Sequence, residues 1–469
     1  MNLPKKNGES VISPPFSEWR ALLKKNRALF DQYRFLVSGA PFYKLRQGIR
    51  ERLKIFPIDP DLPLLLTGHQ PYFIHPGIWF RFFLLARALE ELKVQAAAFV
   101  LDSDLNYGLS APVPVKFEEQ FFRKEIPLEL EGKAFEFLPA PEKGEWDRFL
   151  EQIESCLNFP EAEIARNNFS RIREFPLAQE SFPRFYSRLH RFWEKDPEYP
   201  EFLLSAILGK EFELFFLHIA RDSRNFAYIY NQALQNWRIK RRTRAQNVPF
   251  PDLSASSDQV ELPFWCVIDE KRLPIFLDSS GKCRADGQVL GRPEEVASSY
   301  LIRPRAATLT MFLRLFVCDL FLHGLGGADY EDAVDSIINN FFSVEPPHYV
   351  SAALTLYFPG FDPQKRAGLE NELKKIKRSP ESFLPEEKLS QCRHLISRKL
   401  QLKGQKLSKE GYLELQKINS LLLNQLERET LRLEKEIQLL EEAEEALAFR
   451  KYPFFFFDPQ LMLQLAFQA

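Results

Sequence analysis

The sequence predicts an α/β fold: a Rossmann-like parallel sheet core with helical insertions, followed by a C-terminal α-helical coiled coil. The first observation is an apolar strand that begins at Leu64 and runs into a loop with two histidines, two glycines and two prolines. The second is an amphipathic helix over Ile78–Lys93, followed by a buried strand over Gln95–Leu101. The third is a change beyond Phe361, where aromatic residues become few and charged residues many. A strand, a helix and a strand in this order form a β-α-β unit, from which parallel sheets are built.

Further helices and strands are expected on both sides of this unit. An amphipathic helix over Phe16–Phe35 precedes it, and the region from about 125 to 210, rich in proline and glutamate, is predicted to be a helical insertion. The apolar run Glu213–Ile219 is typical of a strand, and a helix is expected after it from about Arg224 to Arg244. The sheet is therefore expected to resume after the insertion.

A hairpin and two more helices are expected before the C-terminal region. Two short strands, Glu261–Ile268 and Leu273–Leu277, are separated by four charged residues, which fits a hairpin. Ala306–Leu325 is predicted to be a buried core helix, because charged residues interrupt it too often for a membrane span. Another helix is expected over Tyr330–Phe342.

The C-terminal region carries an apolar stripe at helical spacing. Its members recur at intervals of three, four and seven, which is typical of a coiled coil. The arm is expected from about Leu413 to Lys451, after an earlier helix over Glu386–Leu402, and either folds back on itself, pairs with a second chain, or does both. The predicted organisation is an N-terminal helical flank (1–60), a Rossmann-like core (61–360) and a coiled coil (361–469). The stripe consists of Ile418, Leu422, Leu426, Leu433, Ile437, Leu440 and Leu447.

Composition narrows the class of protein. The 63 Lys and Arg residues balance 64 Asp and Glu residues to a net charge of -1, which gives no overall attraction to nucleic acid or to an anionic membrane. The five cysteines are odd in number and lack CxxC spacing, which argues against disulfides and a structural zinc site. The polar N-terminus lacks the apolar segment of a secretory signal. We therefore expect a cytoplasmic protein that binds a small molecule, binds neither nucleic acid nor membranes, and forms a homodimer through the coiled coil.

The loop after the first strand holds the first candidate site residues. His69 and His75 lie at a strand-to-helix turn, where an imidazole pair would bind phosphate or stabilise charge on a leaving group, and where free N–H groups of the helix start favour anions. The alternative is that one histidine caps the helix and the other packs in the core. The loop would be completed by Thr67, Gly68, Gln70 and Gly77.

Two carboxylates follow the second strand. Asp102 and Asp104 flank one serine, so on an extended chain their side chains share a face. They would hold a substrate amine, ribose hydroxyls or a metal, or act as a general base if one raises the pKa of the other. The alternative is a loop that caps the next turn. Because the histidines and carboxylates show no ligand spacing, no metal site is predicted.

Two further motifs lie at the ends of the predicted core helix. Arg303 and Arg305 flank a proline at its start, and a guanidinium fork suits a carboxylate or a phosphate; the alternative is structural ion pairing. His323 and Gly326 belong to a glycine-rich turn at its end, which would cradle a ligand or simply join two helices.

Three segments carry a resemblance to a known family: Thr67-Gly68-His69-Gln70-Pro71, Pro76-Gly77 with the helix after it, and Phe99-Val100-Leu101-Asp102-Ser103-Asp104. In these segments the chain resembles the cysteine ligases that complete bacillithiol synthesis. Those proteins carry TGQQ, a GP(L/I)Y-like helix start and an acidic EDHD-type strand end. Here His69 replaces a glutamine, and Asp102-Ser103-Asp104 replaces the EDHD segment without its histidine. The resemblance implies a Rossmann-like nucleotide-binding core, inserted helices and a C-terminal coiled coil that mediates dimerisation.

Two hypotheses from different classes follow. In the first, the chain is an enzyme, a nucleotide-dependent small-molecule ligase or transferase of the cysteine-ligase type that takes ATP or ADP, with His69, Asp102 and Asp104 as catalytic residues. In the second, it is a non-catalytic scaffold with a degenerate nucleotide-binding core and a coiled-coil dimerisation arm. Under the first hypothesis, truncation at about Phe361 is expected to leave ligand binding intact.

Overall fold

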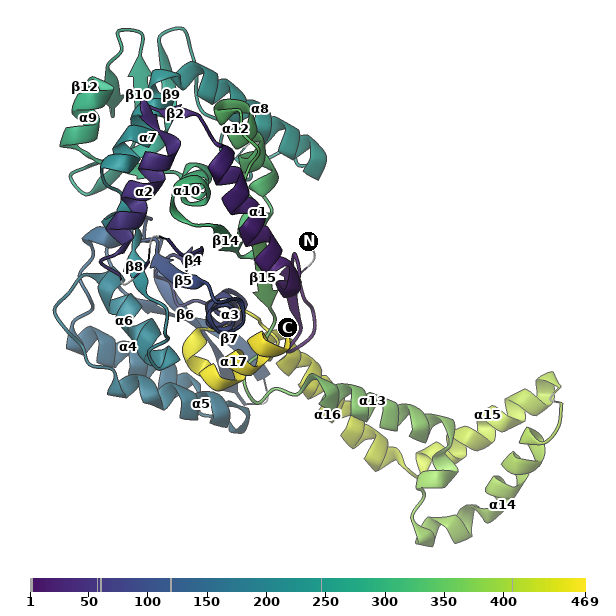
Figure 1. Cartoon of the computed structure of the whole chain (residues 1–469). Coiled ribbons are helices and arrows are strands. Elements are labelled where there is room, and N and C mark those ends of the chain that lie inside the picture. The colour runs from purple at the N-terminus through teal and green to yellow at the C-terminus, as the bar shows by residue number, and fades with distance from the viewer. Residues whose placement is uncertain (1–2, 57, 60, 119, 246, 407) are drawn as a thin grey trace.

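A six-stranded mixed sheet forms the centre of the body, and a helical arm extends away from it (Figure 1). The computed structural model describes residues 3–56, 58–59, 61–118, 120–245, 247–406 and 408–469. The strand order is β1-β15-β14-β4-β5-β8; β1 pairs antiparallel with β15 and the other neighbours are parallel. The sequence prediction of an α/β fold with a mostly parallel sheet is thus confirmed. The strands are β1 (Ser10–Ser13), β4 (Leu64–His69), β5 (Gln95–Val100), β8 (Glu201–Leu203), β14 (Leu320–His323) and β15 (Tyr349–Leu354).

Apolar side chains cover both faces of this sheet, because buried apolar residues occur at consecutive positions in β4, β5, β14 and β15. In β4, Leu65 packs into one core while Leu64 and Leu66 pack into another. The first core contains α3 (Pro76–Leu92) and α17 (Pro459–Gln468), and the second contains helices from three other parts of the chain. Burial on both faces is what parallel strands require. The helices of the second core include α2 (Phe42–Leu53), α7 (Lys210–Arg221), α8 (Ser223–Arg241), α10 (Ala306–Phe312) and α12 (Glu331–Phe342).

The run Glu213–Ile219, which the sequence suggested was a strand, lies inside the helix α7. The buried side chains of this helix explain the difference. Phe212, Phe215, Phe216 and Ile219 follow the i, i+3, i+4, i+7 spacing of a helix face. Consecutive phenylalanines at 215 and 216 made the segment look uniformly apolar, which is typical of a buried strand.

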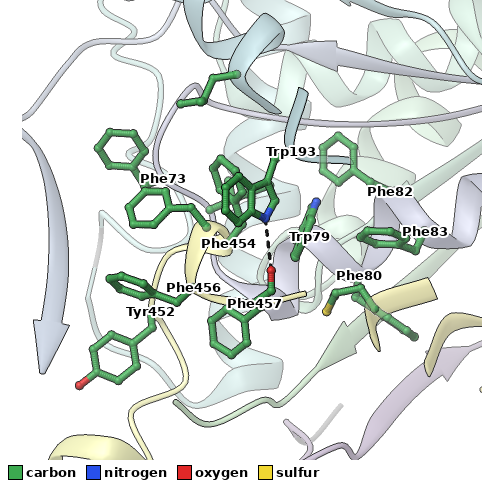
Figure 2. Packing of buried hydrophobic residues seen from close by; sticks show 14 of the residues in the cluster. Phe73, Trp79, Phe80, Phe82, Phe83, Trp193, Tyr452, Phe454, Phe456 and Phe457 are labelled. Carbon is green, nitrogen blue, oxygen red and sulfur yellow. Dashed lines mark hydrogen bonds between the residues drawn. The ribbon is translucent and has the colours of Figure 1, made fainter. Parts of the chain in front are cut away.

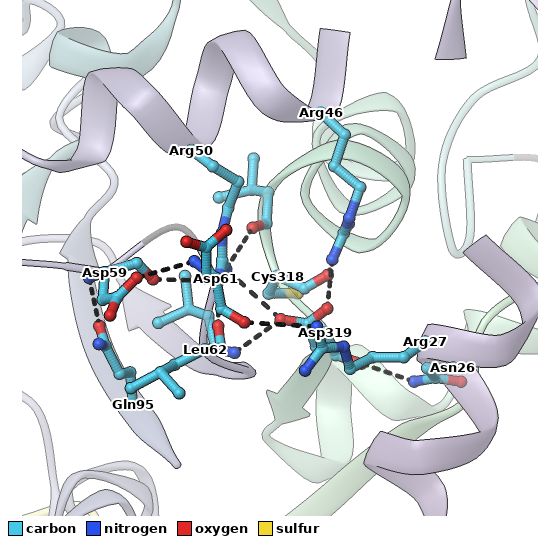
Figure 3. Close-up of polar contacts among 12 residues, drawn as sticks. Asn26, Arg27, Arg46, Arg50, Asp59, Asp61, Leu62, Gln95, Cys318 and Asp319 are labelled. Carbon is cyan, nitrogen blue, oxygen red and sulfur yellow. Dashed lines mark hydrogen bonds and ion pairs between the residues drawn. The ribbon is translucent and has the colours of Figure 1, made fainter. Parts of the chain in front are cut away.

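The segment Ala306–Leu325, predicted as one core helix, divides into three elements. Helix α10 passes into a π-helical turn, η6 (Leu313–Val317), and the chain then enters the central strand β14. Asp319 lies between the π-helical turn and the strand. Its Oδ2 accepts a hydrogen bond from the backbone N–H of Leu64 at 2.7 Å, which aligns β14 with β4. Figure 3 shows that Arg46 and Arg50 of α2 converge on the same carboxylate.

The region from 125 to 210 is largely helical, as predicted, but a hairpin precedes and overlaps it. Strands β6 (Leu109–Phe117) and β7 (Gln120–Leu128) pair antiparallel over their whole length. The hairpin was not predicted, because its outer face carries charged residues and prolines interrupt it. The insertion then contains α4 (Lys143–Cys156), α5 (Glu163–Ser170) and α6 (Phe182–Glu194).

A second, five-stranded antiparallel sheet lies beside the body sheet in the order β12-β11-β10-β9-β13. The predicted hairpin is present as β9 (Gln259–Ile268) and β10 (Lys271–Asp278). The remaining short elements of the body are β2 (Leu36–Val37), β3 (Ala40–Pro41), β11 (Cys283–Ala285), β12 (Gln288–Gly291), β13 (Leu301–Pro304), α1 (Trp19–Gln32), α9 (Pro293–Ser299) and α11 (Leu325–Ala328).

Four helices form the arm: α13 (Pro363–Arg378), α14 (Glu386–Lys403), α15 (Lys409–Asn424) and α16 (Glu427–Leu447). Figure 1 shows α13 beside α16 and, further out, α14 beside α15. The helix expected over Leu413–Lys451 is therefore interrupted at Leu426, where the backbone leaves helical geometry. The apolar stripe lies largely inside the arm, since Ile418, Leu422 and Leu433 are buried there. The homodimer expected from the sequence stays a prediction.

After α16 the chain returns to the body, so residues 448–469 do not belong to the arm as the sequence suggested. Phe454–Phe457 are buried in the first core, and α17 packs on α3. Figure 2 shows Phe454 among Trp79 and Trp193, and the indole N–H of Trp193 donates to the backbone carbonyl of Phe457 at 3.2 Å. The C-terminal segment thus completes the core around α3. None of the helices in the described part of the chain has the length and hydrophobicity to cross a bilayer.

Candidate functional site

A cavity of about 470 Å³ opens where β4 and β14 end. Parallel strands place their carboxyl ends at the same edge of a sheet, where ligands of open α/β proteins bind. Many residues proposed from the sequence meet here, although β14 lies far from β4 along the chain. The cavity is lined by Gly68, His69, Gln70, His75, Gly77, His323 and Gly326 from that set, together with Arg81, Phe99, Leu309, Phe321, Gly327, Tyr330, Arg450 and Lys451 among others.

His75 caps the start of α3, which was the alternative to a phosphate contact. Its Nδ1 accepts a hydrogen bond from the Gly77 N–H at 3.1 Å, and the Ile78 N–H donates to the His75 carbonyl at 2.9 Å. The free N–H groups expected at this helix start are therefore occupied within the protein. Gly77 is required by close packing, because a Cβ there would lie 2.7 Å from the Leu354 carbonyl oxygen.

Both loop histidines are neutral at pH 7. Burial and the neighbouring Arg81 lower the pKa of His69 to about 4, although its Nδ1 also contacts the Gln70 carbonyl at 3.0 Å. Burial and Arg450 lower the pKa of His75 to about 3. Neither imidazole therefore contributes a positive charge to the cavity, and each acts there as a neutral hydrogen-bonding group.

This neutrality predicts a pH dependence of folding. Unfolded histidines protonate near pH 6.5, whereas folded His69 and His75 do so only near pH 4 and 3, so their share of stability is present above pH 6.5 and is lost as pH falls towards 4. A His69→Asn/His75→Asn variant keeps short polar side chains but cannot protonate. Between pH 6.5 and 4 it is expected to lose on the order of 5 kcal/mol less than the wild type in urea unfolding. Parallel pH profiles for the two proteins would contradict the assignment.

Arg81 supplies the buried positive charge of the cavity. It lies one helical turn after Gly77 on α3, is only 4% exposed, and its Nη1 donates to the Thr67 hydroxyl at 3.0 Å and to the Leu322 carbonyl at 3.4 Å. Its Nε has no hydrogen-bond partner, and no carboxylate of the described residues forms an ion pair with it. Burial lowers the pKa of Arg81 to about 10, so the guanidinium is still charged at pH 7.

Arg450 and Lys451 bring two more cations to the cavity from the segment after α16. Arg450 Nη2 donates to the Leu354 carbonyl at 3.2 Å and would lie 2.9 Å from a Cβ on Gly77. No aspartate or glutamate occurs among the described residues that line the cavity. Its lining is therefore positively charged at the polar end and apolar elsewhere, as at Phe99, Leu309 and Phe321.

Asp102 and Asp104 lie behind the cavity and are absent from its described lining. Asp102 is 1% exposed and accepts hydrogen bonds from the backbone N–H of Ser205, at 3.0 Å, and from the Ser205 hydroxyl. Burial raises the pKa of Asp102, while the Ser205 bonds oppose that rise. Asp104 contacts Arg272 Nη1 at 2.9 Å and accepts from Gln70 Nε2 at 3.1 Å, so it orients a cavity residue rather than facing the cavity itself.

Arg303 and Arg305 make structural ion pairs and are likewise outside the described lining. Arg303 Nη2 lies 2.7 Å from a Glu136 oxygen, and Arg305 Nη2 lies 2.6 Å from a Glu261 oxygen. Both guanidinium groups already have the carboxylate partner that a substrate would otherwise supply. The alternative of structural ion pairing therefore describes both residues.

The sequence interpretation missed Arg81, Arg450, Lys451 and Tyr330. Arg81 carries a local signal, since it is a lone charge in the apolar run of α3 at the i+4 position from Gly77. Arg450 and Lys451 carry none, because only the return of the chain after α16 brings them to the cavity. The part of the chain that the structure describes contains no cluster of three or more histidine, cysteine or acidic residues placed to hold a metal ion.

The sequence was compared with models of known protein families and with curated proteins. No model of a known protein family matches the sequence, and no curated protein matches it either.

Proposed function

We propose that the chain is a nucleotide-dependent ligase or transferase of small molecules, with a Rossmann-like core that binds ATP, ADP or another phosphorylated compound in the cavity at the ends of β4 and β14. One observation carries this proposal: Arg81 is a buried guanidinium that lines the cavity, keeps its charge at pH 7 and has no carboxylate partner among the described residues.

The energetic argument is that an unpaired buried charge is costly. Removing a guanidinium from water costs several kcal/mol even after relaxation, and two neutral hydrogen bonds offset only part of that cost. A phosphate group is the natural compensation, because its oxygens accept from the fork of an arginine. The Nε that lacks a partner is the kind of donor that a bound anion would satisfy.

The surroundings of Arg81 favour a phosphorylated ligand with an apolar or aromatic body. Arg450 and Lys451 add charge at the same cavity. The apolar part of the lining, with Phe99 and Phe321, suits a flat ring such as a nucleobase. The resemblance of the 67–71 and 99–104 segments to cysteine ligases supports the choice of ligase over simple storage or transport.

Calorimetric titration of the full chain with phosphate, pyrophosphate, ADP, ATP and adenosine tests the proposal. We expect ADP and ATP to bind, and adenosine, which lacks the phosphates, to bind at least about ten-fold more weakly, the equivalent of ~1.4 kcal/mol. If none of the phosphorylated compounds binds, the proposal is wrong and the scaffold hypothesis replaces it.

A further inference from the structure

A row of buried polar and charged side chains extends from the cavity into the core, and His323 is its member at the cavity. Nε2 of His323, at the end of β14, lies 2.8 Å from Oε1 of Glu331, at the start of α12. The other oxygen of Glu331 contacts Nη1 of Arg314, whose Nη2 also contacts Asp335 at 2.6 Å. Glu331 is 0% exposed and Arg314 is 2% exposed, so solvent does not screen these contacts.

The carboxyl group of Glu331 is ionised. Burial alone would raise its pKa, but Arg314 and His323 outweigh burial and lower it below the ordinary value. A buried carboxylate beside one imidazole nitrogen orients the ring. In His323 that nitrogen is Nε2, which lies 2.8 Å from Glu331 without hydrogen-bond geometry, so Nδ1 is the nitrogen turned away from the carboxylate.

The free nitrogen faces the glycine-rich turn of the cavity. A Cβ on Gly327 would lie 2.5 Å from Nδ1 of His323, whereas a Cβ on Gly326 would meet nothing within 4 Å. Glycine at 327 is therefore required by the close approach of Nδ1, and both glycines line the cavity. Arg314 belongs to the π-helical turn η6, a rare geometry that often occurs at functional sites.

His323 differs from His69 and His75 in the contacts of its ring nitrogens. The Nδ1 of His75 is occupied by the Gly77 N–H, and the Nδ1 of His69 contacts the Gln70 carbonyl. Within the described residues, neither His69 nor His75 forms an ion pair with a carboxylate, whereas His323 does so with Glu331. The carboxylate that makes an imidazole a useful base is thus present at His323.

We propose that His323 is the catalytic base of the cavity, with Glu331 and Arg314 as positioning residues; this rests on the proposed transferase or ligase function. In the transfer step, Nδ1 accepts the proton of an acceptor hydroxyl, thiol or neutral amine while the acceptor lone pair forms a bond to the phosphorus or acyl carbon of the phosphorylated donor. The bond from that atom to the leaving oxygen breaks, and the leaving phosphate or ADP takes the bonding pair. The proton then passes from His323 to the leaving oxygen or to solvent.

The reactivity of His323 towards diethyl pyrocarbonate, measured residue by residue by mass spectrometry, tests the assignment on the full chain. We expect His323 to be modified in the wild type, and saturating ADP to slow that modification at least about ten-fold. Gly327→Ala, which places a methyl against Nδ1, is expected to slow it to a similar extent, and Gly326→Ala is the matched control that leaves the rate unchanged. Glu331→Gln is expected to lower the rate as well, and the Gly327→Ala result stands if that variant fails to fold.

Two results would overturn the base assignment while leaving the proposed function standing. The first is an unreactive His323 in a wild-type protein that binds ADP. The second is loss of ADP binding in His323→Asn, for which we expect a dissociation constant within about three-fold of the wild type. A reactive His323 in a protein that neither binds ADP nor is protected by it overturns the proposed function, and the base assignment with it.

Discussion

Replacing Arg81 with methionine is expected to abolish ADP binding and yet to leave the unliganded protein at least as stable as the wild type. Methionine fills a similar volume without a charge, so the variant no longer bears the cost of a buried, unpaired guanidinium, although it loses the bonds to Thr67 and Leu322. The net gain is expected to lie between zero and ~2 kcal/mol. ADP at about 100 times its dissociation constant adds ~2.7 kcal/mol to the wild type and nothing to the variant. Urea unfolding with and without ADP measures both effects.

Arg303→Met is the matched control for this prediction. Arg303 is also buried, at 7% exposed, but it is paired with Glu136 outside the cavity. Its removal leaves a buried carboxylate without its cation and is expected to cost roughly 3–5 kcal/mol, with the stabilisation by ADP retained. An Arg81→Met protein that is strongly destabilised and still responds to ADP would show that Arg81 is a structural residue.

Phe454→Ala is expected to give the largest loss of stability by a single substitution in the C-terminal segment, roughly 3–5 kcal/mol. Phe454 is 0% exposed, and its ring lies 5.8 Å from Trp79, 5.5 Å from His190 and 6.2 Å from Trp193, measured between ring centroids. Figure 2 shows Phe454 near Trp79 of α3 and Trp193 of α6. The cavity left behind cannot collapse, because rigid aromatic rings surround it. The free energy of unfolding in urea measures the loss.

Leu461→Ala is the control, since Leu461 is 42% exposed on α17 and is expected to change stability by less than about 0.5 kcal/mol. Equal effects of the two substitutions would show that the C-terminal segment is not part of the core.

The packing of the C-terminal segment corrects the expectation that truncation at about Phe361 leaves ligand binding intact. Such a truncation removes Phe454–Phe457 and α17 from the core and Arg450 and Lys451 from the cavity.

The parts of the fold that could be predicted from the sequence are those set by local periodicity. The β4-α3-β5 unit, the β9–β10 hairpin and α12 all follow from the periodicity within their individual strands and helices. Glu213–Ile219 was misjudged because a short apolar run does not by itself separate a buried helix from a buried strand. Ala306–Leu325 was misjudged because its apolar residues continue without a break from α10 through η6 into β14. In the second case the deciding group, Asp319, acts through a bond to Leu64 that no local pattern reveals.

The residues of the candidate site also fall into two groups, those that local sequence predicts and those that only distant contacts decide. His69, Gln70 and His75 reach the cavity because a strand-to-helix turn at the end of a parallel strand points there in most α/β folds. Asp102 also follows a strand end, yet Ser205 takes up its oxygens. In the sequence, Arg303 is as good a candidate for anion binding as Arg81. The structure distinguishes them, because Arg303 is paired with Glu136, whereas no carboxylate of the described residues pairs with Arg81.

The most direct test of the central claim is a crystal structure of the full chain with ADP. The account predicts a phosphate oxygen within about 2.7–3.2 Å of the Arg81 guanidinium, in the cavity at the ends of β4 and β14. ADP bound at another place, with Arg81 still lacking an anionic partner, would contradict it.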